Sequence, residues 1–294
     1  MEKLIQTIIL GILIGGVYSL MASGLTLIFG VMNIINVAHG AFLVLSALVT
    51  WEIWKTTGMD PLLAGLITTP MMFIVGWVVY KLFLQRLRNA APSMTVLLTF
   101  GLALVLEGGM GIVTRNVFRS VTPSYFSSSF HLGPFFLPKP QVYGCIAAIG
   151  LMVLLYLGLT RTWTGRAIRA SSQNLSSAQL VGISSTSVAA LTFAVAAATT
   201  GFGGSILSVL FTFFPASHYA WIARLLGIIV LGGMGSLPGV VIGALALGIA
   251  ETMTATYISL RWATVVFYLV ILAVLLVRPQ GLLGVKLRQD VAAA

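Results

Sequence analysis

Polar side chains that recur between two apolar segments are the first candidates for chemistry. Asn33, Asn36 and His39 follow one another at intervals of three residues, with Gly30 and Gly40 on either side. On a helix this spacing places the three polar side chains near one face, and polar groups in a bilayer are unfavourable unless they are paired or face a cavity. We weigh two interpretations: a break in the helix that lines a substrate path, or a hydrogen-bonded packing cluster between helices.

A second candidate is the glycine-dense segment Gly232–Gly239, which contains Pro238. Proline after glycines cannot continue a helix, and non-helical backbone at membrane depth survives only when it is buried in protein or lines water. The segment is therefore either a hinge or re-entrant turn, or a plain tight turn at the cytoplasmic surface. Together the two segments give the residues that we assign to a translocation path: Asn33, Asn36, His39, Gly40, Gly232, Gly233 and Gly235.

Two carboxylates, Glu107 and Glu251, are the only acidic residues well inside apolar runs. An intramembrane carboxylate is a functional candidate by default, and a proton-coupled transporter needs one. We favour a structural role for both, because paired polar residues commonly stabilise helix bundles. Glu251 is then expected to cap its helix or to pair with Arg261, and Arg224 is expected to be an anchor whose head group reaches the membrane surface.

Several catalytic and ligand-binding patterns are missing from the sequence. It contains no GxxxxGK[ST] phosphate loop, no HExxH and no GxSxG, so the chain has neither the usual means of binding ATP nor a visible catalytic constellation. His131 and His218 fall in expected outside loops, far along the sequence from His39, and Cys145 is the single cysteine. We therefore predict a protein that is not itself an enzyme and that holds no metal and no cofactor.

Composition places the chain in a membrane. Apolar residues make up 59% of its 294 residues and charged residues 7%, whereas soluble domains carry about 25% charged residues. The net charge of +10 arises from basic residues in short connections beside apolar runs, where they set orientation rather than bind nucleic acid. We expect an all-α polytopic protein that contacts lipid, with its first apolar segment retained because it is too long for a cleaved signal.

Nine apolar segments are candidates for membrane spans. They are Leu4–Phe29, Ile34–Trp51, Pro61–Leu82, Met94–Thr114, Val142–Leu159, Ser187–Phe211, Ala223–Gly232, Pro238–Tyr257 and Trp262–Val277. The seventh is too short to cross unaided, since about 20 residues are needed, so it either extends back towards Phe214 or is one arm of a broken or re-entrant element. The predicted bundle has eight or nine spans and forms one membrane domain over residues 1–294.

Basic residues define the orientation, because they are retained on the cytoplasmic side. Three clusters follow the third, fifth and last spans: Lys81, Arg86 and Arg88; Arg161, Arg166 and Arg169; Arg278, Lys286 and Arg288. These clusters share one side if every span crosses once, which places the amino terminus outside and the carboxyl terminus inside. A weak likeness between Phe29–Asn33 and Leu231–Gly235 suits two structurally repeated halves.

The segment Arg161–Thr186 is a polar, basic island of helical length between two apolar runs. Its apolar residues Ile168, Leu175, Ala178 and Val181 recur at roughly helical intervals. The pattern predicts a short amphipathic helix at the cytoplasmic membrane surface. Such a helix in the middle of a membrane chain is suited to contact something outside the membrane.

Four stretches, together with the terminal Arg278–Gly284, resemble the permeases of branched-chain amino acid ABC importers. They are Asn36–Gly40, Gly165–Ala170 continuing to Leu180–Ile183, Leu231–Gly239 and Gly248–Glu251. Their order and spacing match that family over nearly the whole chain, which is similar to the shorter, leucine-importer-type permease subunit.

The resemblance implies a type II importer bundle in the bacterial inner (plasma) membrane. It also implies a second permease, two cytoplasmic ATP-binding subunits and a periplasmic substrate-binding protein as partners. The central segment is then the coupling helix that docks the ATPases, through Gly165, Arg166, Arg169, Asn174, Gln179 and Gly182. The chain departs from the family at Gln173-Asn174, where an acidic residue is common, so its contacts there are expected to rely on neutral hydrogen bonds.

Two rival functions stay open on the residues alone. One is a secondary transporter coupled to protons or sodium through Glu107 or Glu251, and the other is a passive channel with glycine-rich selectivity elements. Neither accounts for the central amphipathic helix. The residues do not identify the substrate: branched-chain amino acids are the family default, and urea, amides and aromatic acids are known alternatives. They also do not show whether the partner permease is a second copy.

Overall fold

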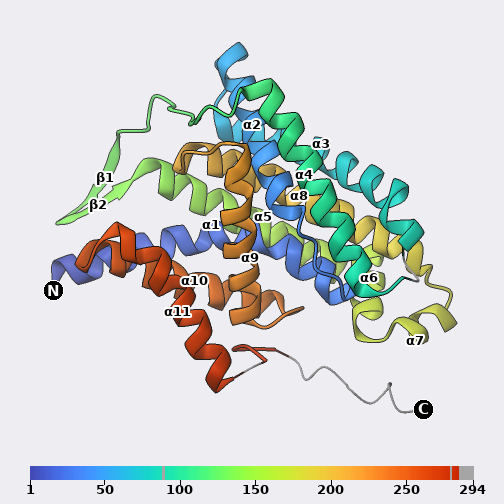
Figure 1. Cartoon of the computed structure of the whole chain (residues 1–294). Coiled ribbons are helices and arrows are strands. Elements are labelled where there is room, and N and C mark those ends of the chain that lie inside the picture. Colours follow the sequence, from blue (N-terminus) through green and yellow to red (C-terminus); the bar gives the residue numbers. More distant parts are fainter. Residues whose placement is uncertain (88–89, 279, 285–294) are drawn as a thin grey trace.

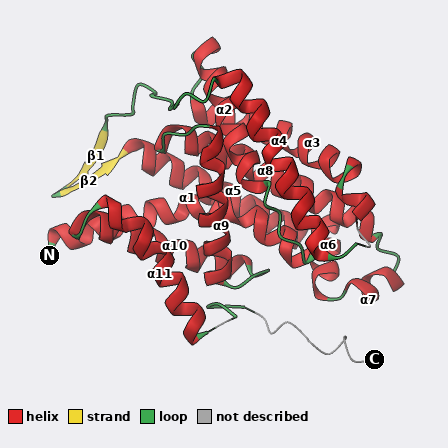
Figure 2. Ribbon diagram, in the orientation of Figure 1, coloured by secondary structure: helices red, strands yellow, loops and turns green. Residues whose placement is uncertain are grey.

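The structure is a computed structural model that describes residues 1–87, 90–278 and 280–284. Figure 2 shows that these residues form a bundle of helices with a single two-stranded hairpin. The elements are α1 (Glu2–Met32), α2 (His39–Thr57), α3 (Pro61–Leu82), η1 (Leu84–Leu87), α4 (Pro92–Thr114), β1 (Ser129–Leu132), β2 (Phe135–Pro138), α5 (Lys139–Arg161), α6 (Trp163–Gln173), α7 (Leu175–Leu180), α8 (Ser185–Leu210), η2 (Pro215–Ser217), α9 (His218–Gly232), α10 (Leu237–Tyr257) and α11 (Leu260–Val277).

Seven of the described helices are long and apolar enough to cross a membrane. These are α1, α3, α4, α5, α8, α10 and α11. The prediction of an all-α polytopic membrane protein is therefore confirmed. The remaining long helices, α2 and α9, are different, because each begins at a fully buried histidine; α2 follows the non-helical residues 33–38, and α9 follows the short helix η2 directly.

The helix α9 extends back towards Phe214, which was one of the two alternatives for the seventh segment. It starts at His218, whereas the apolar run from Ala223 to Gly232 had suggested a shorter segment. The earlier start brings Trp221 and Ile222 into the core. At 15 residues the helix is about 22 Å long, which is still less than the roughly 30 Å of a hydrocarbon core.

Two antiparallel helix pairs form the most extensive contacts of the bundle. In the pair of α3 and α8, a Cβ added at Gly201 would lie 2.7 Å from the carbonyl oxygen of Thr68. In the pair of α1 and α10, a Cβ added at Gly11 would lie 2.6 Å from the Cα of Ile249. Small residues let helix backbones approach closely in a bilayer, where packing rather than the hydrophobic effect drives association.

Four helices contact one another in a reciprocal pattern, which suits two repeated segments of opposite direction. Helix α1 packs on α10, and α8, which runs in the opposite direction, packs on α3; a broken connection then leads from α1 to α2 and from α8 to α9. By this relation α1 corresponds to α8 and α2 to α9. The likeness between Phe29–Asn33 and Leu231–Gly235 does not fit this relation, because the first segment is at the end of α1 and the second is at the end of α9.

The two ends of the bundle differ in charge. Lys81, Arg86, the basic residues of α6 and Arg278 share the end that carries α6 and α7, which we call the inner end. Figure 1 shows the amino terminus and the hairpin at the opposite, outer end, where the Gln6 side chain accepts a hydrogen bond from the Phe136 amide at 3.0 Å. This distribution agrees with the predicted orientation; Arg88, Lys286 and Arg288 lie outside the described residues.

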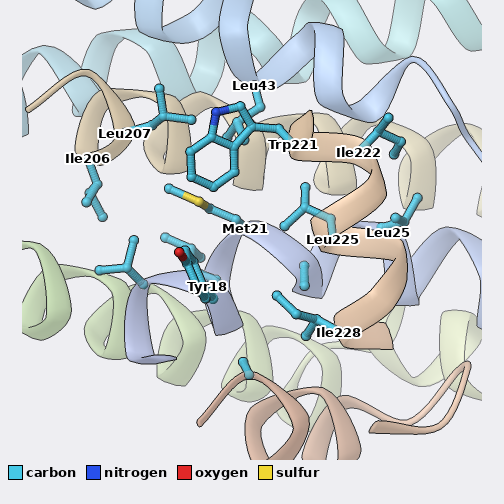
Figure 3. Close-up of a cluster of buried hydrophobic side chains, with 14 of the residues drawn as sticks. Tyr18, Met21, Leu25, Leu43, Ile206, Leu207, Trp221, Ile222, Leu225 and Ile228 are labelled. Carbon is cyan, nitrogen blue, oxygen red and sulfur yellow. The ribbon is translucent and has the colours of Figure 1, made fainter. Parts of the chain in front are cut away.

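The central core lies where α9 crosses α1. Figure 3 shows Trp221 and Leu225 of α9 facing Tyr18 and Met21 of α1. The rings of Tyr18 and Trp221 meet edge to face, with their centroids 6.2 Å apart, as aromatic pairs prefer. The helix that begins inside the bundle is thus held by the longest helix of the fold.

We expect Gly201→Ala to destabilise the protein and Gly101→Ala to leave it unchanged or slightly more stable. The first methyl group would meet the backbone of α3, and overpacking costs about 1–3 kcal/mol; the second would enter open space. Both changes favour the helix by a similar amount, about 1 kcal/mol. The midpoint of thermal unfolding in detergent measures the difference, and equal midpoints for the two variants would contradict the close contact of α3 and α8.

Candidate functional site

A cavity of about 350 Å³ opens at the inner end of the bundle. It brings together Asn33, a predicted path residue, and Gln179, a predicted coupling residue. Its other lining residues are Val31, Met32, Ile34, Tyr80, Leu84, Leu87, Ala90, Thr95, Leu175, Ser185, Thr186 and Ala189. Asn33 also ends α1, with a left-handed φ of 53° that asparagine adopts more readily than most residues.

The remaining predicted path residues of the first cluster lie deeper, between α1 and α9. Asn36 and His39 are fully buried, and Nε2 of His39 donates to the carbonyl oxygen of Met21 at 3.1 Å. A Cβ added at Gly40 would lie 2.6 Å from the carbonyl oxygen of His218. The predicted break in the helix is therefore present, but these residues are in the core and do not line the cavity; a role in transport stays a prediction.

This buried cluster is only partly satisfied. The Oδ1 atom of Asn36 accepts a hydrogen bond from the Ala38 amide at 3.1 Å. Within the described part of the chain, Nδ2 of Asn36 and Nδ1 of His39 have no hydrogen-bond partner. Buried polar atoms without a partner are unfavourable. The cluster is therefore not a fully hydrogen-bonded packing contact, and both interpretations of it stay open.

Gly232, Gly233 and Gly235 form a tight turn at the inner end. Gly233 and Gly235 have φ angles of 103° and 84°, which favour glycine. The turn is covered by the end of the described chain, because Leu282 donates its amide to the carbonyl oxygen of Leu231 at 2.8 Å. None of the three glycines is among the lining residues of the cavity, and their assignment to the path also stays a prediction.

The predicted amphipathic helix is two helices with a break at Asn174. Thr162 caps α6 by accepting from the Gly165 amide at 3.0 Å, and Asn174 caps α7 by accepting from the Ser177 amide at 2.9 Å. Because a new helix starts at Asn174, the helical phase is reset. Ile168 and Ala178 are buried, whereas Leu175 and Val181 are exposed and Leu175 lines the inner cavity.

The predicted coupling residues surround this helix pair. Gly165 lies directly against the backbone of α5 at Leu159, and Gly182 has a φ of 85° with open space around it. Arg166 and Arg169 are exposed, and the guanidinium of Arg166 lies 5.1 Å from the ring centre of Trp163. The pair thus presents basic and aromatic side chains to the surroundings at the inner end.

Glu251 is part of a closed polar network. Its Oε1 accepts from Arg224 at 2.8 Å and its Oε2 from the Tyr18 hydroxyl at 2.8 Å. The Arg224 guanidinium also lies over the rings of Tyr18, Trp221 and Phe267. Two expectations were therefore wrong: Glu251 does not pair with Arg261, and Arg224 is an interior residue rather than a surface anchor. The physical reason is that α9 carries Arg224 between α1 and α10.

Glu107 joins α4 to the first turn of α9. Its Oε2 accepts from Nε2 of His218 at 3.0 Å and from the Tyr219 hydroxyl at 2.9 Å. His218 is fully buried, so its expected place in an outside loop was wrong. The sequence contained a signal for this contact, because a carboxylate in an apolar run needs a hydrogen-bond donor, but the signal does not say which residue provides it.

The described side chains contain no group of three or more His, Cys, Asp or Glu that could hold a metal ion. The polar side chains described above form hydrogen-bonded pairs and triads between helices instead. The site therefore consists of the inner cavity, the helix pair α6–α7 beside it and the two carboxylate networks.

Comparison with known proteins gives one family. The model of the branched-chain amino acid transport system permease component matches residues 7–275. The permease LivH of the high-affinity branched-chain amino acid transport system of Escherichia coli strain K12 is 29% identical over 95% of both chains. BraD of Pseudomonas aeruginosa is 25% identical over 95% of both chains, and a probable LivH of Methanocaldococcus jannaschii is 26% identical over 90% of this chain and 88% of its own. No solved structure matches the chain significantly.

We expect Glu251→Gln to lower the free energy of unfolding by about 3 kcal/mol, because it leaves the partly buried Arg224 without a counter-charge. In the Arg224→Gln background the same change should cost much less, since no uncompensated cation remains. The double-mutant cycle is measured by thermal unfolding in detergent. Glu52→Gln, at an exposed position, is the control, and additive losses in the double variant would show that the pair does not act as a unit.

Proposed function

Because the chain belongs to the branched-chain amino acid transport system permease family, we propose that it is the membrane-spanning permease subunit of an ATP-driven importer. It is a multi-pass protein of the inner (plasma) membrane. Counting α2 and α9, which begin inside the bundle, the described residues form nine membrane-embedded helices, with the amino terminus outside and the carboxyl terminus inside. The chain forms the path and carries out no covalent chemistry itself.

The observation that carries the proposal is the exposed helix pair α6–α7 beside the inner cavity. The sequence has no phosphate-binding loop, so a transporter of this family requires ATP hydrolysis by other subunits. Two cytoplasmic ATP-binding subunits would dock on α6–α7 through Arg166, Arg169, Asn174 and Gln179. Neutral hydrogen bonds from Gln173 and Asn174 would replace the acidic contact that is common in the family.

A movement of the docked ATPases can reach the bundle through short links. Gly165 packs directly on the end of α5, and Ser184 caps α8 by accepting from the Ser187 amide at 3.4 Å. Gln179 lies in the same cavity as Asn33 at the end of α1. A rigid displacement of α6–α7 would therefore shift α5, α8 and the cavity wall together, as expected for a rigid-body transition.

The substrate is proposed to be a branched-chain amino acid or a related small polar solute. LivH and BraD, to which the chain is similar, are named for high-affinity branched-chain amino acid transport. A periplasmic binding protein would deliver the substrate to the outer end, and a second permease would complete the path. The path would then pass the break between α1 and α2, where Asn36 and His39 have unpaired polar atoms.

Reconstitution in vesicles tests the proposal. Leucine uptake should need ATP, the ATP-binding subunits, the second permease and the binding protein together. Uptake driven by a proton or sodium gradient through this chain alone would overturn the proposal in favour of a secondary transporter, and downhill flux without ATP would favour a channel.

We expect Gly182→Trp and Arg166→Glu each to leave less than about a tenth of the wild-type ATPase bound to the purified permease. Tryptophan cannot easily adopt the positive φ of Gly182, and a reversed charge at an interface can cost several kcal/mol. Co-purification and ATPase activity measure the loss. Arg115→Glu, an exposed change at the outer end, is the matched control; a complex that survives both inner-end changes would remove the docking assignment.

A further inference from the structure

The two carboxylates inside the bundle differ in how completely they are satisfied. Both oxygens of Glu251 accept a hydrogen bond, one of them from the guanidinium of Arg224. Both donors to Glu107 reach the same oxygen, Oε2. No residue of the described chain donates to its Oε1, and no Lys or Arg there pairs with it. Glu107 therefore has a free oxygen and a negative charge for which only an imidazole is a counter-group.

The place of Glu107 makes this arrangement costly unless something else binds there. Glu107 lies seven residues before the end of α4, about 10 Å of helix from the outer end. A quarter of its side chain is exposed, and a carboxylate cannot face hydrocarbon. This side of α4 must therefore face protein or water in the assembled transporter.

The surroundings of the free oxygen have room and an apolar wall. A Cβ added at Gly108, the next residue of α4, would meet nothing within 4 Å, so no described element covers the helix surface next to Glu107. Leu104, one helical turn towards the inner end, is 44% exposed and lies on the same side of the helix. A polar group with a neighbouring apolar surface is the chemistry that an aliphatic amino acid would require.

We propose that Glu107 binds the α-ammonium group of the amino acid near the outer entrance of the path, with Oε1 as the acceptor. This rests on the proposed function, since it names how the same path takes up its substrate. The buried ring of His218 and the Tyr219 hydroxyl hold Oε2 and thereby fix the carboxylate plane; they are positioning residues. Glu251, whose charge is already balanced, holds α1, α9 and α10 together instead.

The proposal is tested by leucine uptake in vesicles that contain the complete transporter. For Glu107→Gln we expect uptake per assembled complex to fall at least about tenfold, because hydrogen bonds to charged groups are worth about twice as much as neutral ones. ATPase activity stimulated by the binding protein should persist, because the inner end is unchanged. Glu107→Asp, which keeps the charge, should retain more uptake than Glu107→Gln, and Tyr219→Phe should reduce uptake less than either.

Glu251→Gln is the matched control, because it removes the other intramembrane charge. It should lower the amount of assembled complex while uptake per complex stays near the wild-type value. Wild-type uptake per complex in Glu107→Gln would overturn the ammonium site and leave the importer function standing. Absence of ATP-dependent uptake by the wild-type complex would instead overturn the proposed function.

Chemical labelling decides the question even if Glu107→Gln does not assemble. Cys145 is the only native cysteine and is buried, so Glu107→Cys in a Cys145→Ala background offers a single target. A water-soluble, positively charged thiol reagent added from outside should label position 107, and leucine-loaded binding protein should slow the labelling. A cysteine that stays unlabelled in the complete complex, because a partner side chain or lipid covers it, would overturn the proposal.

Discussion

Backbone inside a bilayer can leave the helix only where other protein groups take over its hydrogen bonds, and the arrangement of this bundle depends on two such places. One lies between α1 and α2 and the other between α8 and α9. Each is followed by a helix that begins at a buried histidine. The two restarted helices meet at Gly40, where the absence of a side chain lets α2 approach the carbonyl oxygen of His218. The long helices are arranged around this central contact.

The same constraint explains the distribution of charge. Helices that begin in the interior bring polar termini to membrane depth, and side chains from neighbouring helices compensate them. His218 is held by Glu107 of α4, and Arg224, two turns further along α9, is held by Glu251 of α10. Both intramembrane carboxylates thus bind side chains of the short helix α9. They differ in that Glu251 accepts hydrogen bonds on both oxygens and Glu107 on Oε2 only.

Much of the fold could be predicted from the sequence, because apolar length and basic connections are local signals. The seven long apolar helices follow from them directly, whereas the predicted span Ile34–Trp51 is replaced by non-helical residues 33–38 and α2, and the orientation stays a prediction. The partners of Glu107 and Glu251 could not be predicted, since they depend on which helices become neighbours. Arg261 is nearer to Glu251 in sequence than Arg224, yet α9 places Arg224 at 2.8 Å. The break in the inner helix pair could not be predicted for a local reason: Asn174 can continue a helix or cap a new one, and here its side chain caps α7.

The contact between the last described residues and the turn after α9 has a consequence for biosynthesis. The amides of Leu282 and Leu283 donate to the carbonyl oxygens of Leu231 and Gly232 at 2.8 and 3.0 Å. A ribosome makes those amides some fifty residues after the turn, because the residues of α10 and α11 are synthesised in between. Until then the turn has open acceptors, so a nascent or truncated chain carries an unfinished inner surface.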